Sequence, residues 1–165
     1  MKTKVLGKKI KKIHVSAKDH LDSIPRNSKK IKHGIDIWNV YDFMFKDKKE
    51  VPHLKVLEII IPSNSKFIVE SKSMKLYLNS FYDVAFNNQA EILKKIKRDL
   101  KSLIKDDVKL RFLEKFSVEP KNLSLNKSNR KIIQCKKVIK FNGFRSICPV
   151  TSQPDFANIY IYSSD

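Results

Sequence analysis

Two segments in the first half of the chain alternate apolar and polar residues with the period of two that is typical of β-strands. The first segment covers residues 36–44 and the second covers residues 53–61. The charged residues 46–52 separate the two segments, and Pro62 follows the second one. This pattern predicts a β-hairpin.

The next two segments repeat their apolar residues with the spacing of an α-helix. The first predicted helix begins after Glu70 and continues to Phe81. At the start of the second, Asn88 is followed three residues later by Glu91, which is a signature of a helix N-terminus. Apolar residues then mark one face of residues 88–104, and lysines mark the opposite face.

Alternation returns in the second half of the chain. It predicts further strands at residues 107–116, 132–141, 144–148 and 156–162. Between the first two of these strands we expect a polar loop at residues 119–130, and before the hairpin we expect a basic arm at residues 1–33. The predicted order is therefore β-β-α-α-β-β, an α+β fold class, followed by the beginning of a second, similar pattern.

The composition is that of a folded protein. Hydrophobic residues make up 41% of the 165 positions, which is enough for a core and argues against a disordered chain. With only 3 Gly and 6 Pro, a collagen-like or linker-like chain is excluded. The length fits one ordinary domain, or one domain and part of a second.

The formal net charge of +18 raises the question of a nucleic-acid partner. Only five of the 35 basic residues are Arg, although base reading and bidentate phosphate binding favour Arg over Lys. The chain is also rich in Ile and Asn, which share A/T-only codons with Lys. We therefore do not expect nucleic acid as the direct substrate, and a basic RNA-associated module remains an alternative.

The cysteines and histidines argue against a secreted or metal-binding protein. The chain has two Cys, Cys135 and Cys148, without the spacing of a disulfide framework, so we expect a cytoplasmic location. None of the four His has metal-ligand spacing with either Cys, so no metal site is predicted. The longest apolar run is residues 59–61, which predicts neither a secretory signal nor a membrane span.

Cys148 is the first candidate for chemistry. It stands before Pro149, and together with Pro154 this proline restricts the backbone of the following loop. A Cys on such a loop, with Arg145 nearby, has the setting of a nucleophilic thiol, and Asp155 lies within reach as a proton carrier. The alternative is a half-buried structural Cys before a turn.

Glu70 is the second candidate, at the start of the first predicted helix. Its carboxylate is suited to accept hydrogen bonds from the adjacent N–H groups of a guanine-like ring. Ser71, Lys72 and Ser73 then lie where the free N–H groups of a helix favour phosphate. The alternative is an ordinary helix cap with solvated lysines.

Two segments together resemble one enzyme family. Residues 69–81 resemble the E-S-K-S-hydrophobic-K motif of the NADPH-dependent 7-cyano-7-deazaguanine reductases, oxidoreductases of queuosine biosynthesis, a pathway of tRNA modification. Residues 148–155 resemble the C-x-x-T-x-Q-P-D segment of the same family. Residues 33–38 and 6–8 are similar to its N-terminal region.

The resemblance implies the tunnelling fold (T-fold), a β-β-α-α-β-β module with an antiparallel sheet and two helices. It also implies reduction of the nitrile to 7-aminomethyl-7-deazaguanine by NADPH through a Cys thioimide, with a homodimer as the expected assembly. The implied site residues are Cys148 and Asp155 for catalysis, Ile68, Val69 and Glu70 for the deazapurine, and Ser71 and Lys72 for NADPH.

Glu70 precedes Cys148 in this chain, which is the order of the two-module members of that family. We therefore expect the arm at residues 1–33, a first T-fold module at residues 34–141, and the start of an incomplete second module at residues 142–165. An inactive or partner-dependent remnant of such a reductase remains an alternative to an active enzyme.

Overall fold

The computed structural model describes four stretches of the chain, residues 17–26, 33–125, 138–148 and 151–162. These stretches belong to two compact units, which divide between Lys115 and Phe116. Each unit is described by itself below. The element composition is α+β, as predicted.

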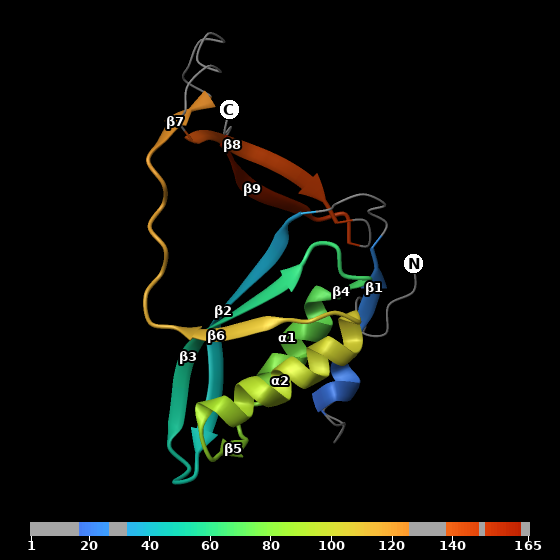
Figure 1. Ribbon diagram of the computed structural model, residues 1–165, viewed down its shortest axis with the longest axis vertical. Coiled ribbons are helices and arrows are strands. Elements are labelled where there is room, and N and C mark those ends of the chain that lie inside the picture. The colour runs from blue at the N-terminus through green and yellow to red at the C-terminus, as the bar shows by residue number, and fades with distance from the viewer. Residues whose placement is uncertain (1–16, 27–32, 126–137, 149–150, 163–165) are drawn as a thin grey trace. The chain divides into compact units, whose positions relative to one another are not determined.

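Unit 1 is built on a four-stranded sheet (Figure 1). Strands β2 (Ile35–Asp47) and β3 (Pro52–Pro62) form the predicted antiparallel hairpin, with one irregularity between Val40 and Phe43. Strand β6 (Lys109–Leu113) pairs antiparallel with β3. The short strand β5, Ala85–Phe86, extends the sheet on the other side of β2.

Both predicted helices are confirmed, and they lie side by side on one face of this sheet (Figure 1). Helix α1 spans Ser71–Asn79 and helix α2 spans Gln89–Ile104. The Asn88 side chain accepts a hydrogen bond from the Glu91 N–H at 2.9 Å, which is the N-terminal cap that the sequence predicts. Lys105, with a φ of 59°, ends α2 in the left-handed conformation.

The core of unit 1 lies between the helices and the sheet. Alternate residues of β3 and one stripe of each helix point into it, because strands repeat every two residues and helices every 3.6. The largest fully buried side chains are Tyr77, Phe43, Phe81, Leu57, Ile59, Ile61, Met74, Ile92, Ile96, Leu100 and Ile104. Burying each of these contributes on the order of 1.5–3 kcal/mol relative to exposure.

Part of the predicted basic arm is folded into unit 1. Residues 17–20 form a short 3-10 helix (η1), and Leu21 is 3% exposed within the core. Strand β1 (Ser23–Pro25) pairs antiparallel with β4 (Phe67–Val69). The expectation of a loop or arm fails for residues 17–26 because three-residue strands are too short to show a periodic pattern. Residues 1–16 and 27–32 of the predicted arm lie outside the described residues.

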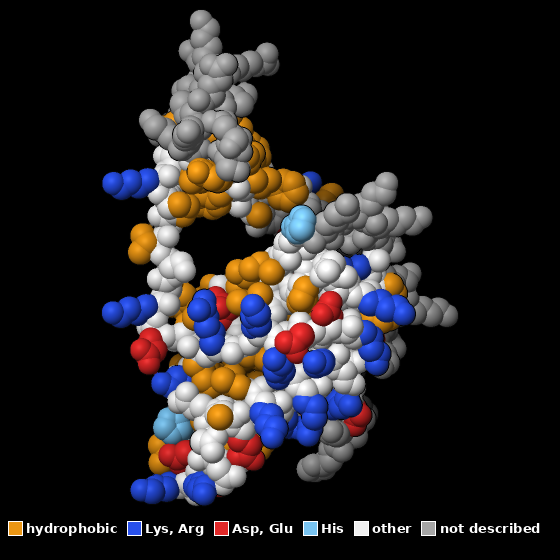
Figure 2. Space-filling model, viewed as in Figure 1, with side chains coloured by type: hydrophobic (Ala, Val, Ile, Leu, Met, Phe, Trp, Pro, Cys, Tyr) orange, Lys and Arg blue, Asp and Glu red, His pale blue; other side chains and the backbone are white. Residues whose placement is uncertain are grey.

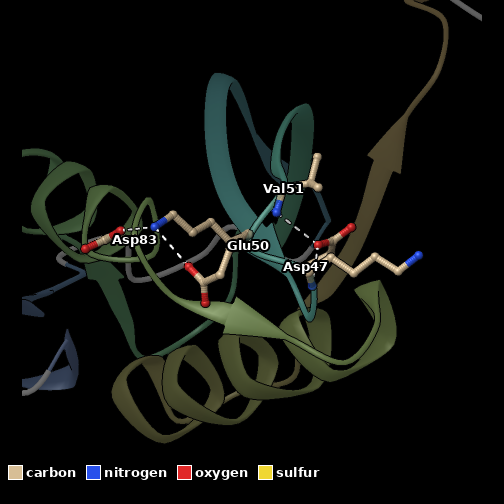
Figure 3. A network of polar contacts seen from close by, with 6 residues as sticks. Asp47, Glu50, Val51 and Asp83 are labelled. Carbon is tan, nitrogen blue, oxygen red and sulfur yellow. Dashed lines mark hydrogen bonds and ion pairs between the residues drawn. The ribbon is translucent and has the colours of Figure 1, made fainter.

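Two polar networks hold the turn between β2 and β3 (Figure 3). The Asp47 carboxylate accepts the Val51 N–H at 3.1 Å and so closes the turn. On the other side, the Lys46 ammonium contacts Asp83 and Glu50. The turn is thereby connected to the segment that follows α1.

Unit 2 is a three-stranded sheet in the order β7-β8-β9. Strand β7 (Asn122–Ser124) is parallel to β8 (Val138–Ile147), which is antiparallel to β9 (Pro154–Ile161). Strand β7 corrects the prediction of an unstructured polar loop at residues 119–130. Its three residues, Asn-Leu-Ser, again carry no periodic signal.

Strand β8 replaces two of the predicted strands. It runs continuously where strands at 132–141 and 144–148 were expected, and residues 132–137 lie outside the described residues. Gly143, with a φ of 94°, stands at a register shift in the pairing with β9, so the interruption in the pattern is a β-bulge. The module boundary expected between residues 141 and 142 lies inside this strand.

The described part of unit 2 contains no buried side chain. Many of its large apolar residues are exposed, and Figure 2 shows hydrophobic side chains gathered on the surface of this unit. The exposed members are Phe116, Val118, Leu125, Phe144, Ile147, Phe156, Tyr160, Ile161 and Tyr162. Among all the described residues, neither α-helix is long and apolar enough to cross a lipid bilayer.

Candidate active site

Glu70 is the N-terminal cap of α1. Its Oε1 accepts the Lys72 N–H at 2.9 Å, and its Oε2 accepts the Ser73 N–H at 2.8 Å. The Glu70 residue is only 2% exposed. Of the two interpretations of Glu70, the helix cap is confirmed, and its contact with a deazapurine ring stays a prediction.

The main chain of Glu70 is held as well. The Glu70 N–H donates to the Asp22 carbonyl at 2.9 Å, and the Glu70 carbonyl accepts the Ser73 hydroxyl at 2.8 Å. The Asp22 N–H in turn donates to the Ser73 hydroxyl oxygen at 3.0 Å. A role for Asp22 could not be inferred from the sequence, because its partners lie about fifty positions further along the chain.

Ile68 and Val69 are the last two residues of strand β4 and precede Glu70. The N–H and C=O groups of Ile68 point to one edge of the strand, and those of Val69 point to the other edge. In an antiparallel pair, hydrogen-bonded positions alternate with non-bonded ones. The bond from Glu70 to Asp22 therefore places Ile68 at a bonded position opposite Ile24. The N–H and C=O groups of Val69 are directed away from β1, so Val69 is the predicted ring contact whose main chain is not committed to this pairing.

Ser71 and Lys72 lie on the first turn of α1, as their predicted cofactor role requires. Ser71 is exposed, and Lys72 is half-buried. Ser71 lines a groove of about 290 Å³ between β2 and α1, together with Trp38, Tyr41, Met74 and Lys75. The lining of this groove combines aromatic surface with one ammonium group, that of Lys75, and one carboxylate, that of Asp42.

Cys148 and Asp155 are brought together by the hairpin of β8 and β9. The Cys148 N–H donates to the Gln153 carbonyl at 2.9 Å, and Ser146 is paired with Asp155. Paired residues share a face of a sheet, as do alternate residues of one strand. Cys148 and Asp155 are therefore diagonal neighbours on one face, a relation in which residues lie about 7–8 Å apart and their Cβ atoms somewhat closer.

Arg145 does not take the place that the sequence suggested. It is paired with Phe156 and lies three residues before Cys148, so it belongs to the opposite face of the hairpin. Cys148 itself is half-buried at the end of β8, which agrees with the structural interpretation of this residue. Its role as a nucleophile stays a prediction.

The predicted site residues thus form two sets. The Glu70 set lies in unit 1, at the junction of β4 and α1, and the Cys148 set lies in unit 2, at the end of a hairpin. Within each set, the structure brings the members together.

Comparison with known proteins links the chain to one family. A family model described as "Nitrile reductase, 7-cyano-7-deazaguanine-reductase N-term" matches residues 10–112. A protein of Buchnera aphidicola subsp. Schizaphis graminum named NADPH-dependent 7-cyano-7-deazaguanine reductase is 32% identical over 89% of this chain and 65% of its own length.

Proteins with the same name from Rickettsia bellii and Coxiella burnetii are 33% and 30% identical, over 78% and 79% of this chain and 54% of their own lengths. The chain therefore spans between about half and two thirds of the curated relatives that it matches. Since the family model covers more than half of the chain and includes helix α1 with the E-S-K-S residues, the chain belongs to the 7-cyano-7-deazaguanine (nitrile) reductase family.

Proposed function

We propose that this chain acts in the NADPH-dependent reduction of 7-cyano-7-deazaguanine to 7-aminomethyl-7-deazaguanine, a step of queuosine biosynthesis. The observation that carries the proposal is the family match over unit 1, and the pairing of Ser146 with Asp155, two residues before Cys148, supports it. The relatives' names supply the substrate and the cofactor. The chain covers only part of those relatives, so its activity is tested below on the chain itself.

In this proposal Cys148 is the nucleophile. Its sulfur adds to the nitrile carbon, the carbon–nitrogen triple bond becomes a double bond, and the nitrogen takes one proton, so that a thioimide forms without a leaving group. Asp155, diagonal to Cys148, supplies and relays protons at the nitrogen. Cys148 is half-buried and therefore still accessible to a small planar substrate.

Glu70 is the proposed recognition group for the ring. A carboxylate has about four lone-pair positions, and two of those of Glu70 accept helix N–H groups, while the Ser71 hydroxyl donates to Oε1 at 3.4 Å. In the proposal, two adjacent N–H donors of a guanine-like ring take the remaining position on Oε2 and replace the Ser71 hydroxyl on Oε1. Because the residue is 2% exposed, binding requires the neighbouring side chains to open around it.

NADPH supplies the hydrides of this reaction. Ser71 and Lys75 of helix α1 line the groove beside β2, where Trp38 adds an aromatic surface for a ring and Asp42 adds a carboxylate. At about 290 Å³ the groove is at the lower end of the usual size of ligand pockets, about 300–1,000 Å³, so it suits one part of a dinucleotide. Ser71 and Lys72 are the residues that we propose to bind it.

The remaining parts of the proposal concern architecture. Unit 1 has the β2–β3 hairpin, the two helices on one face of the sheet and the strand β6 that follows them, which are the first five elements of a T-fold module, and we propose that it belongs to one. A homodimer and a cytoplasmic location belong to the same proposal. The exposed apolar residues of unit 2 favour a second version, in which the chain is active only together with a partner.

Intact-mass measurement of the chain with the cyano substrate tests the chemistry. The mass is expected to increase by that of one whole nitrile molecule, because the addition releases nothing. Cys148→Ala should abolish this increase, while Cys135→Ala should leave it in place. An adduct that survives Cys148→Ala rules out Cys148 as the nucleophile.

Oxidation of NADPH by the isolated chain separates the two versions of the proposal. An active enzyme consumes two NADPH for each nitrile reduced to an amine, because the reduction takes four electrons. Adduct formation on Cys148 without NADPH consumption favours the partner-dependent version. If the chain forms no adduct and oxidises no NADPH, the proposed function fails for this chain.

A further inference from the structure

Ser73 lies three residues after Glu70, the candidate recognition group, and is bonded to it. It lies in the first turn of α1 and is fully buried, with 0% exposure. Its N–H donates to Glu70 Oε2 at 2.8 Å, and its hydroxyl donates to the Glu70 carbonyl at 2.8 Å. The hydroxyl oxygen also accepts the Asp22 N–H at 3.0 Å.

These bonds close a ring through two distant parts of the chain. Ser73 connects to the Asp22 main chain, the Asp22 carbonyl accepts the Glu70 N–H at 2.9 Å, and Glu70 returns to Ser73. We call this arrangement the Ser73 clasp. It fixes Glu70 at its N–H, its carbonyl and one carboxylate oxygen, while the Lys72 N–H holds the other oxygen. The orientation of the carboxylate therefore depends on strand β1 as well as on α1.

We propose that Ser73 is a positioning residue that sets the ring selectivity of this site by holding the Glu70 carboxylate through the clasp. The inference rests on the proposed function in one respect, namely that Glu70 contacts the ring. Selectivity of this kind arises when a ring that lacks one N–H leaves a buried acceptor unpaired. That penalty requires a carboxylate that cannot turn away. The Lys72 and Ser73 N–H groups bind the carboxylate, and the Ser73 hydroxyl holds the main chain of Glu70 and the first turn of α1 that present them.

The helix provides a matched control for Ser73. The Ser80 hydroxyl donates to the Tyr77 carbonyl three residues before it, at 2.6 Å, just as the Ser73 hydroxyl donates to Glu70 three residues before it. Ser80 is half-buried and lies at the other end of α1. Ser73→Ala and Ser80→Ala thus remove the same kind of bond, and only the first removes a contact with Glu70 and Asp22.

Amide hydrogen exchange tests the clasp without any ligand. In Ser73→Ala, the Asp22 amide loses its acceptor, and the Lys72 amide keeps as its acceptor a carboxylate whose main chain is no longer held by the Ser73 hydroxyl, so both should exchange faster, by about tenfold or more. Ser80→Ala should leave these two amides unchanged. If Ser73→Ala folds and both amides keep their protection, the clasp does not hold Glu70, and the proposal is overturned.

Ligand discrimination tests the link to recognition. Dissociation constants are measured for 7-cyano-7-deazaguanine and for its analogue without the 2-amino group, in a Cys148→Ala background that prevents covalent addition. Ser73→Ala should lower the ratio of the two constants by about tenfold, whereas a purely structural effect would weaken both ligands equally. An unchanged ratio overturns the proposal.

Failure of the proposed function and failure of the Ser73 proposal give different results in these experiments. If the background chain binds neither ring, the proposed function fails for this chain, and the exchange experiment still decides whether the clasp holds Glu70. If Ser73→Ala does not fold, Ser73→Cys replaces it, because a thiol fills the buried site but is a weak donor and acceptor. The same faster exchange at Asp22 and Lys72 is expected for that variant.

Discussion

The two sets of candidate residues are supported in opposite ways. Glu70 is buried, and bonds that connect β1, β4 and α1 hold it from several sides. Cys148 lies at the end of a two-stranded hairpin in a unit whose described residues include no buried side chain. A group that recognises a ring by geometry needs rigid support, whereas a thiol that must reach a nitrile carbon needs access.

The two sets also differ in how far along the chain their supporting residues lie. Cys148 and Asp155 are seven residues apart, and one hairpin is sufficient to bring them to one face. Glu70 is supported by Asp22, which is 48 positions earlier, so its geometry depends on the complete packing of unit 1. We therefore expect damage to the core of unit 1 to affect recognition, and damage to unit 2 to affect mainly the covalent step.

The largest expected effect comes from comparing two phenylalanines on strands. Phe43 is 1% exposed in unit 1, and Phe156 is 71% exposed in unit 2. Phe43→Ala should lower the free energy of unfolding by about 3–5 kcal/mol, because it leaves a cavity. Phe156→Ala should change it by less than about 0.5 kcal/mol. Denaturant unfolding followed by circular dichroism measures both, and equal costs would show that Phe156 is buried in solution.

The next effect concerns a buried polar pair in unit 1. The Tyr77 hydroxyl donates to the Asp99 carboxylate at 3.0 Å, and Asp99 is 2% exposed. Tyr77→Phe should cost about 1–3 kcal/mol, since it removes a partner of a buried carboxylate. Tyr162→Phe, at an exposed position, should cost almost nothing. If both variants lose a similar free energy of unfolding, the bond from Tyr77 to Asp99 does not stabilise unit 1 as its burial predicts.

The same tyrosine has a consequence at high pH. Burial, and next the Asp99 carboxylate, raise the pKa of the Tyr77 hydroxyl far above its usual range. Its contribution to stability is therefore complete below the pKa of tyrosine in the unfolded chain, about 10, and is lost as the pH rises further. Tyr77→Phe should remove this alkaline component from the dependence of the unfolding midpoint on pH.

A smaller effect contrasts the two candidate carboxylates. Glu70→Ala removes the cap of α1 and should lower the free energy of unfolding by about 1 kcal/mol. Asp155→Ala, on the exposed strand β9, should leave stability unchanged to within about 0.5 kcal/mol. Both variants should lose nitrile reduction if the proposed function is right. If Glu70→Ala has the same free energy of unfolding as the unsubstituted chain, the cap contributes little to stability.

The smallest effect is one that both units should share. A hydrogen bond with His53, followed by one with the Val51 N–H, lowers the pKa of the Asp47 carboxyl in unit 1. In unit 2, the Lys140 ammonium lowers the pKa of the Glu119 carboxyl. Because these pKa values are lower in the folded state, stability is complete above the unfolded pKa values of about 4 and falls below them.

Asp47→Asn and Glu119→Gln test that effect by urea unfolding between about pH 3 and pH 6. Each variant should show a slightly weaker dependence of the unfolding midpoint on pH than the unsubstituted chain. Both groups are accessible to solvent, so the changes should decrease at high salt. A dependence that stays the same in Asp47→Asn would mean that its bonds to the turn do not differ between the folded and unfolded chains.

How much the sequence predicts follows the length of each pattern. The hairpin of β2 and β3 and the helices α1 and α2 were predicted, because each has enough residues to show its period. Strands β1 and β7 were missed, since three residues show no period. The bulge at Gly143 divided one long strand into two in the sequence pattern, because one extra residue reverses the alternation.

The candidate site divides in the same way. The cap at Glu70 and the closeness of Cys148 to Asp155 could be inferred from neighbouring residues, because capping and hairpin pairing act over a few positions. The place of Arg145 on the other face could not, since it depends on the register of β8 with β9. The support of Glu70 by Asp22 depends on pairing between strands that are more than forty positions apart.

The sequence by itself thus determined the α+β class, the main hairpin, the two helices, the family and the candidate residues, because these follow from local periodicity and short motifs. Only the tertiary structure decided that residues 17–26 belong to the core unit and that Ser73 ties Glu70 to Asp22. It also decided that unit 2 exposes its apolar residues. These features depend on which distant segments pack together, and no local pattern encodes that choice.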